Sequence, residues 1–231
     1  TPREPWVYSQ YAVSVYKFYA WLRENLLKYS VHTAEEAHKT GIPMMRPLPM
    51  VFPEDKEAVY WEDEYFYGSD LLVAPVHQEG EKRRIYFPSG SWINLLDFRK
   101  MVGGNRIFQV DVPIDKIPVY IREGACILSV MNGELQLGQS MTYEKKNTVL
   151  MSRALNETSG KRYADGKEIE YNILGKTGED FFMLRHASET EFIVLLGFDR
   201  KPESLELNGV SLSEGASLNA LNYGSGWYWR E

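Results

Sequence analysis

The sequence predicts a mainly β protein in which a short helical region and one strand precede two β-sandwich domains. Three observations support this fold class. Apolar residues recur at helical spacing in the first 41 residues. After Leu71, short apolar runs return about every ten residues and are separated by Gly and Pro turns, as in β-sandwiches. A chain of 231 residues that is 44% hydrophobic and 25% charged has the composition of a soluble globular protein with one large or two small domains.

The helical region begins near Ser9, which is a plausible N-cap. A helix is expected to run to residue 29, because apolar residues recur at steps of three and four. The helical pattern resumes at Thr33, where T-A-E-E has the capping-box spacing with Glu36. Gly41 then ends it as a C′ glycine. The apolar positions of the first helix are Val15, Tyr19, Leu22, Leu26 and Tyr29.

A single strand follows the helices. Met44-Met45-Arg46 leads into a short apolar strand bounded by Pro47 and Pro49. An acidic, aromatic loop then reaches a second apolar run, Leu71–Val76, which has the texture of a buried strand. Two helices and a strand cannot enclose a core by themselves, so residues 1–68 are expected to pack against something else.

The rest of the chain is divided into two β domains, 69–138 and 139–231. Asn208-Gly209, between two short apolar runs, is the strongest hairpin signal. The strands expected in the first domain are Leu71–Val76, Arg84–Phe87, Trp92–Leu95, Ile107–Val112, Val119–Arg122 and Ala125–Leu128. Those expected in the second are Thr148–Arg153, Glu168–Ile173, Asp180–His186, Glu191–Gly197 and Ser204–Leu207.

Composition and spacing exclude several functions. The net charge of −6 argues against nucleic-acid binding, and Lys82-Arg83-Arg84 is interpreted as the solvated edge of a hairpin. No apolar run reaches the roughly 18 residues of a membrane span. His32, His38, His77 and His186 lack zinc-pair spacing, and Cys126 is the sole cysteine. We therefore expect no metal, no cofactor and no internal disulfide.

The densest acid cluster is Glu62-Asp63-Glu64, preceded by Trp61. Three adjacent acids cannot all point into one site. One interpretation is a polar helix start between two strands, and the other is a catalytic carboxylate beside an aromatic platform. The second cluster, Glu54-Asp55-Lys56-Glu57, is interpreted as a solvated turn. Trp227-Tyr228-Trp229 is either a core strand or a carbohydrate-stacking tip.

Five motifs, in order, resemble the C-terminal third of family 31 glycoside hydrolases, the α-glucosidase and α-xylosidase group. They cover about residues 1–128, and beyond Gln139 the likeness is a β-rich domain of similar length. The motifs are Arg3-Glu4-Pro5-Trp6, Gly41-Ile42-Pro43-Met44-Met45-Arg46-Pro47-Leu48, Asp63–Gly68 with Leu71–Val76, Tyr86–Trp92, and Ile117–Gly124.

The resemblance implies the last helices and strand of an (α/β)8 barrel, followed by proximal and distal β-sandwich domains. Such enzymes retain configuration through an aspartate nucleophile and an aspartic acid/base, which need carboxyl groups about 5–5.5 Å apart. Both are expected upstream of Thr1, so no catalytic residue is expected in this chain. Glu62–Glu64 then aligns with the connection after the last barrel strand.

The chain is accordingly expected to be the C-terminal part of a retaining α-glycosidase that hydrolyses terminal α-linked sugars. Its role would be structural, its partners the rest of the barrel and a glycoside substrate, and the isolated chain would be inactive. Arg46, on the side where barrel active sites lie, either contacts substrate or fixes the strand end as an ion pair. The alternatives are a carbohydrate-binding or assembly module, and a self-sufficient hydrolase that uses Asp63 or Glu64. A homo-oligomer is left open.

Overall fold

The structure is a computed structural model. It describes residues 3–77, 80, 82–98, 101–140, 145–152, 157–164, 167–176, 179–186, 193–197, 203–204, 206–207, 210–215 and 226–227. The chain separates into two units, Thr1–Gly197 and Phe198–Glu231. The first unit contains the helices and the larger sheets, and the described residues of the second form the short strands β15 to β18.

The helical region consists of a 3-10 turn, η1 (Pro5–Val7), and two helices, α1 (Gln10–Asn25) and α2 (Leu27–Thr40). Ser9 caps α1 as expected, because its Oγ accepts a hydrogen bond of 3.0 Å from the Ala12 N–H. Gly41 ends α2 in the left-handed region at φ 76°, and its N–H donates to the Ala37 carbonyl.

The expected capping box at Thr33 is wrong. α2 begins at Leu27, and Thr33 lies inside the helix, where its hydroxyl donates to the Ser30 carbonyl at 2.9 Å. A threonine hydroxyl can return to a carbonyl of the preceding turn instead of capping. The break between the helices is the single residue Leu26, which has φ −90° and ψ 10°.

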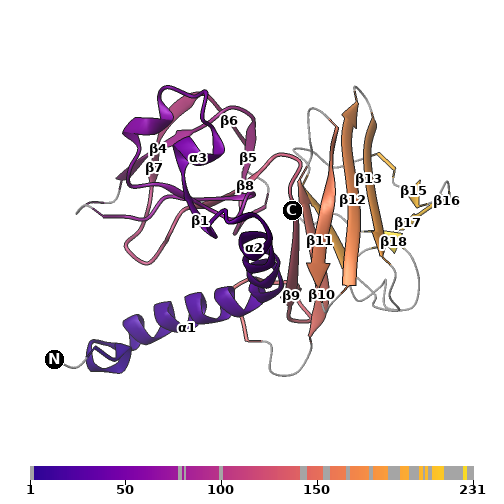
Figure 1. The fold of residues 1–231 in the computed structure, drawn as a ribbon. Helices are drawn as coiled ribbons and strands as arrows, with labels where there is room; N and C mark the ends of the chain where they lie inside the picture. The colour runs from indigo at the N-terminus through magenta and orange to yellow at the C-terminus, as the bar shows by residue number, and fades with distance from the viewer. Residues whose placement is uncertain are drawn as a thin grey trace. The chain divides into compact units, whose positions relative to one another are not determined.

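The first β region is a six-stranded antiparallel sheet in the order β1-β2-β3-β8-β5-β6 (Figure 1). A separate antiparallel pair, β4–β7, packs with it, and α3 (Leu48–Val51) and η2 (Ala58–Tyr60) lie between β1 and β2 in the sequence. The strands are β1 (Met45–Pro47), β2 (Tyr65–Tyr67), β3 (Leu71–Val73), β4 (Lys82–Phe87), β5 (Ser91–Asn94), β6 (Met101–Gly103), β7 (Arg106–Asp111) and β8 (Val119–Arg122).

Aromatic side chains form the centre of this region. Trp92 is completely buried and lies 5.8 Å from Phe66 and 6.2 Å from Phe87, measured between ring centroids. Phe87 also meets Tyr120 edge-on at 4.7 Å. These rings come from β2, β4, β5 and β8, so one aromatic cluster joins the sheet to the β4–β7 pair.

The second β region is a sandwich of two three-stranded sheets, β14-β10-β9 and β11-β12-β13. β10 is antiparallel to β9 and parallel to β14, and their buried side chains share a core with Ile169, Tyr171 and Ile173 of β12. Its strands are β9 (Cys126–Met131), β10 (Lys146–Ser152), β11 (Thr158–Ala164), β12 (Lys167–Lys176), β13 (Glu179–His186) and β14 (Ile193–Gly197).

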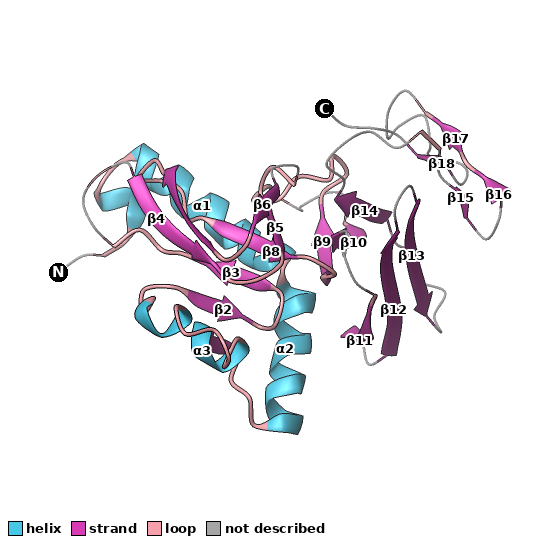
Figure 2. Ribbon diagram, turned by 90° about the horizontal axis from the view of Figure 1, so that it is seen from above, coloured by secondary structure: helices cyan, strands magenta, loops and turns pink. Residues whose placement is uncertain are grey.

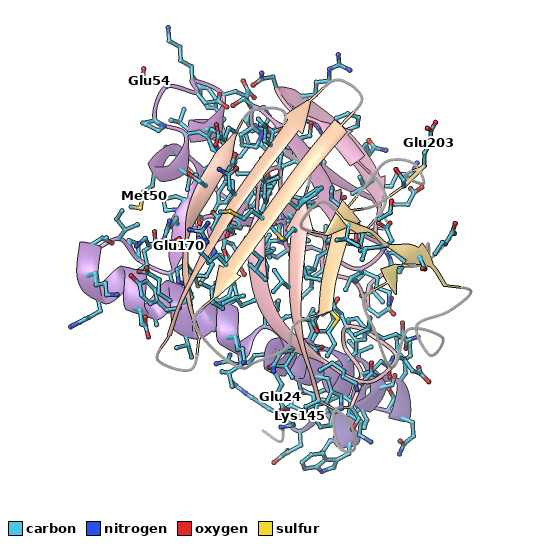
Figure 3. All side chains as sticks on the ribbon, turned by 90° about the vertical axis from the view of Figure 1, so that its right-hand side faces the viewer. Glu24, Met50, Glu54, Lys145, Glu170 and Glu203 are labelled. Atoms are coloured by element: carbon cyan, nitrogen blue, oxygen red, sulfur yellow. The ribbon has the colours of Figure 1, made fainter. Side chains whose placement is uncertain are left out.

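The helices are fastened to this sandwich. Asn25 at the end of α1 donates to the Val130 carbonyl and accepts from the Gly138 N–H, both at 2.8 Å. Lys28 donates to Asn147 at 3.0 Å, and Glu24 lies beside Lys145 at 3.9 Å (Figure 3). The helical region therefore rests on β9 and on the segment that leads into β10.

The structure is mainly β, as expected, and most expected strands are present. β2, β6, β11 and β17 were not predicted. The division at residue 138 falls between β9 and β10, which pair with each other, and the division into domains stays a prediction. In the described part of the chain, no helix is long and apolar enough to cross a membrane.

The second unit contains two strand pairs. β15 (Glu206–Leu207) pairs antiparallel with β16 (Val210–Ser211), which matches the expected hairpin, although its turn, Asn208-Gly209, lies outside the described residues. β17 (Ser213–Glu214) pairs parallel with β18 (Gly226–Trp227). The side chain of Trp227, and all of residues 228–229, lie outside the described residues.

Candidate functional site

The acid cluster lies in the turn that leads into β2. No helix starts there, so the expected polar helix start is wrong. The three acids are in different environments: Glu62 is exposed, Asp63 is half-buried and Glu64 is buried. Asp63 and Glu64 both lie beside the guanidinium group of Arg83, whereas Glu62 faces solvent.

Glu64 lies inside the protein with its side chain fully covered. Its Oε1 accepts a hydrogen bond of 3.0 Å from the Tyr86 N–H and lies 3.6 Å from Nη2 of Arg83. Its Oε2 is buried without a partner. Burial raises the pKa of Glu64 to about 8, and the Tyr86 N–H and Arg83 oppose this shift. At neutral pH the carboxyl group therefore carries a proton.

Asp63 is held in an ion pair. Its Oδ2 lies 2.9 Å from Nη1 of Arg83 and 3.2 Å from Nε2 of His77. Arg83 also donates to the Asp63 carbonyl at 3.2 Å. The interpretation of residues 82–84 as a solvated edge is therefore wrong for Arg83, which alternates inward on β4 and is 7% exposed. The guanidinium group joins the start of β2 to β4.

Trp61 stacks on Tyr86, with ring centroids 5.8 Å apart and planes at 17°. Its indole N–H donates to Glu57 at 3.1 Å. The Tyr86 hydroxyl donates to Asp55 at 2.7 Å, and the second oxygen of Asp55 accepts from the Glu57 N–H. The turn at residues 54–57, expected to be simply solvated, is thus tied to β4 by hydrogen bonds. Trp61, the aromatic residue beside the acids, takes part in these contacts.

Arg46 points into the fold from β1. Its Nε donates to the Pro43 carbonyl at 2.8 Å, and its Nη2 forms an ion pair of 2.6 Å with Glu36 of α2. The side chain is 7% exposed. The structure thus contains the ion pair that fixes the start of the strand to the preceding helix. Substrate contact by Arg46 stays a prediction.

A buried ion pair that the sequence did not reveal joins the two β regions. Nη2 of Arg162, on β11, lies 2.7 Å from Oδ2 of Asp70, just before β3. Nε of Arg162 donates to the Cys126 carbonyl at 2.8 Å. The Tyr29 hydroxyl accepts from the Asp70 N–H at 3.1 Å and donates to the Tyr67 carbonyl at 2.9 Å, which brings α2 into the same network. Figure 2 shows the ribbon of α2 next to that of β2.

The described histidines lie in separate environments. His32 is buried, its Nδ1 accepts from the Tyr163 N–H at 3.3 Å, and the two rings stack. Burial, followed by the charge of Arg162, lowers the pKa of His32, so it is neutral at pH 7. His77 pairs with Asp63, His38 is exposed, and the side chain of His186 is not described. Among the described residues, no group of three potential ligands is close enough to hold a metal ion.

The ion pairs and hydrogen bonds described above hold separate segments of the fold together. Asp63 is ion-paired, and Glu64 is buried with a proton. Burial raises the pKa of the Cys126 thiol to about 12, so this thiol is not an activated nucleophile. The fold defines the class of protein as a β-rich region packed beside a pair of helices, in which Arg46, Asp63 and Glu64 make structural contacts.

Residues 41–127 match the family model described as the glycosyl hydrolase family 31 C-terminal domain, and the chain belongs to this family. It aligns over 224 residues with the isomaltosyltransferase of Sporosarcina globispora, at 28% identity, covering 94% of this chain and 20% of that protein. Alpha-glucosidase 2 of Bacillus thermoamyloliquefaciens is 31% identical over 126 residues, covering 54% of this chain and 16% of that protein.

A solved structure shares the fold along almost the whole chain. The cycloalternan-forming enzyme of Listeria monocytogenes, solved in complex with a pentasaccharide substrate, has a TM-score of 0.87 at 25% identity. The match covers 98% of this chain and 23% of that chain. The chain therefore spans about a fifth of the length of the relatives that it matches.

Proposed function

We propose that the chain is the C-terminal part of a retaining α-glycosidase, in which residues 1–68 complete the catalytic barrel and the β regions pack on it. The observation that carries this proposal is the family 31 match, which starts at Gly41 and ends at Ile127, the second residue of β9. One relative is named an isomaltosyltransferase and another an alpha-glucosidase. The whole enzyme would act on a terminal α-linked sugar, with water or a second sugar as acceptor.

The exposed side chains of the N-terminal region support the proposal that a partner covers this surface. Trp6 is 68% exposed, Tyr11 57% and Tyr16 61%, although all three have large apolar surfaces. Met45 on β1 is 58% exposed, and β1 is an edge strand with one described neighbour. A large exposed apolar surface beside an open strand edge is typical of an interface. The rest of the barrel is the partner that this proposal assigns to it.

The acids of this chain suit a structural role better than a catalytic one. A retaining reaction needs one ionised carboxylate as nucleophile and one carboxyl group as acid/base, about 5–5.5 Å apart, on either side of the glycosidic bond. Glu64 is enclosed, so no sugar reaches it, and Asp63 is neutralised by Arg83. We therefore place both catalytic groups outside the 231 residues.

Two measurements test the proposal. The chain alone should not hydrolyse an aryl α-glucoside, whereas a chimera should be active if this chain replaces the matching fifth of the Sporosarcina isomaltosyltransferase. Turnover by the isolated chain that disappears in Asp63→Ala would show a self-sufficient hydrolase. A folded but inactive chimera would contradict the structural role. The alternative of a carbohydrate-binding module at Trp227 and residues 228–229 stays a prediction, because those side chains lie outside the described residues.

A further inference from the structure

A groove of about 480 Å³ lies away from the ion pairs described above. Three loops form it: the loop that follows α3, the turn between β4 and β5, and the turn between β6 and β7. Its size falls within the roughly 300–1,000 Å³ of small-molecule sites. Its lining residues are Val51–Lys56, Ser89 and Asn105.

The walls of the groove are fixed by backbone contacts. The Gly104 N–H donates to the Gly90 carbonyl at 2.7 Å, which holds the two turns together. A Cβ at Gly104 would lie 1.9 Å from the Pro88 carbonyl oxygen, so this close approach requires glycine. Asn105 follows at φ 56°, a left-handed conformation that Asn tolerates better than most residues. Asn105 is one of the lining residues of the groove.

Two side chains that line the groove, Phe52 and Asp55, are also held in place by contacts. The ring of Phe52 packs 5.7 Å from Phe66 of the core, and the Arg122 guanidinium lies 4.7 Å from its centroid. The Asp55 carboxylate is oriented by the Tyr86 hydroxyl and the Glu57 N–H. A carboxylate has about four acceptor positions, so these two bonds leave Asp55 able to accept from a ligand.

The lining chemistry favours a neutral ligand with hydroxyl groups. Val51, Phe52 and Pro53 offer an apolar surface, while Ser89 and Asn105 can both donate and accept hydrogen bonds. Asp55 and Glu54, which lies at the outer edge of the loop (Figure 3), disfavour an anion, and Lys56 offsets one of their two negative charges. A pyranose ring matches this lining because it has an apolar C–H face and a rim of hydroxyl groups.

We propose that this groove is a binding subsite for an α-linked glucosyl oligosaccharide, outside the catalytic centre; the choice of ligand rests on the proposed function. In an enzyme that acts on such chains, the groove would hold sugar units remote from the reacting bond. Remote contacts of this kind increase affinity for long substrates without taking part in the chemistry.

The test is an NMR titration of the ¹⁵N-labelled chain with isomaltose, up to about 50 mM, because an open site with few contacts implies a Kd of millimolar order. Amide signals of Val51–Lys56, Ser89 and Asn105 should shift in a saturable manner. Asn105→Gly removes the amide and keeps the left-handed backbone, and Lys56→Ala removes one donor. Each should weaken binding about threefold or more.

The matched control is Lys82→Ala, an exposed lysine at the opposite end of β4, which should leave the Kd unchanged. Absence of saturable shifts in the groove, or equal shifts with the open-chain polyol sorbitol, would overturn the subsite. The chimera assay is independent of this result. If the chimera is active but isomaltose causes no saturable shifts in the groove, the subsite alone is refuted. If the groove binds isomaltose but the folded chimera is inactive, the proposed function is refuted.

Discussion

Glu64 shows how position in the fold determines the chemistry of a residue. In the sequence it is the last of three adjacent acids, Glu62-Asp63-Glu64, and it directly precedes the aromatic strand β2. In the structure it alone is enclosed, with one backbone N–H donor and a partly satisfied arginine beside it. Burial therefore decides its protonation state, because the transfer of a charge from water costs more than these two contacts return.

Glu64 should make the stability of the chain depend on pH. Its folded pKa is about 8 and its ordinary value is 4.5, so the folded state binds the extra proton between these values. The free energy of unfolding contributed by this group is unaffected below pH 4.5 and falls as the pH rises towards 8, by on the order of 4 kcal/mol. Glu64→Gln cannot ionise, so it should remove this loss.

Urea unfolding followed at several pH values measures the effect. The wild-type chain and Glu64→Gln should diverge between pH 5 and pH 8, with the variant more stable at the higher pH. Glu62→Gln, at the exposed neighbouring acid, is the matched control and should parallel the wild type. Parallel curves for wild type and Glu64→Gln would show that the buried carboxyl group is not protonated.

At the scale of elements, the fold is held together by contacts between segments far apart in the sequence. Asp70 and Arg162 join the turn before β3 to β11, and Tyr29 adds α2 to the same network. Arg162 keeps its charge: burial disfavours it, yet Asp70 and the surrounding groups raise the pKa of Arg162 above its ordinary value. Gly68 allows the close approach of Tyr29, because a Cβ there would lie 2.3 Å from the Tyr29 hydroxyl.

Removing one partner of this buried pair should strongly destabilise the chain. Asp70→Asn leaves the Arg162 guanidinium enclosed without its counter-charge, so the expected loss is about 3–5 kcal/mol. The matched control is Glu168→Gln, which breaks the exposed pair of Lys161 and Glu168 at 2.6 Å. That loss should stay below about 1 kcal/mol, since water screens surface ion pairs. Denaturant midpoints measure both, and equal losses would contradict the importance of burial.

The elements that the sequence predicts correctly are those set by local chemistry. Ser9 caps a helix, Gly41 ends one, and alternating or continuous apolar runs give most strands. β11 was missed because its sequence, T-S-G-K-R-Y-A, has no apolar alternation, and its pairing with β12 comes from the tertiary fold. The inward position of Arg83 and the partner of Arg162 depend on segments distant in the sequence, so no local pattern could reveal them.

At the scale of the whole molecule, the helices, the six-stranded sheet and the sandwich depend on one another. Asn25 fastens α1 to β9 and to Gly138, and Arg46 fastens β1 to α2. β9, which pairs with β10 in the second β region, follows β8 of the first β region in the sequence. The family was identified from the order of its motifs, which local residues encode. The groove could not be found in this way, because three separate loops form it.

The exposed aromatic side chains of η1 and α1 lead to the last prediction. If the rest of a barrel covers them in the whole enzyme, the isolated chain should bind a hydrophobic dye through this surface. Trp6→Ser combined with Tyr16→Ser should lower the dye fluorescence by roughly half, since each aromatic side chain offers about 150–250 Å² of surface. Ile114→Ser is the control, because Ile114 is 88% exposed but lies outside this helix. The chimera should bind less dye than the chain alone, because its barrel would cover the same residues. Undiminished dye binding by the double variant, or by the active chimera, would mean that the barrel packs elsewhere on the chain.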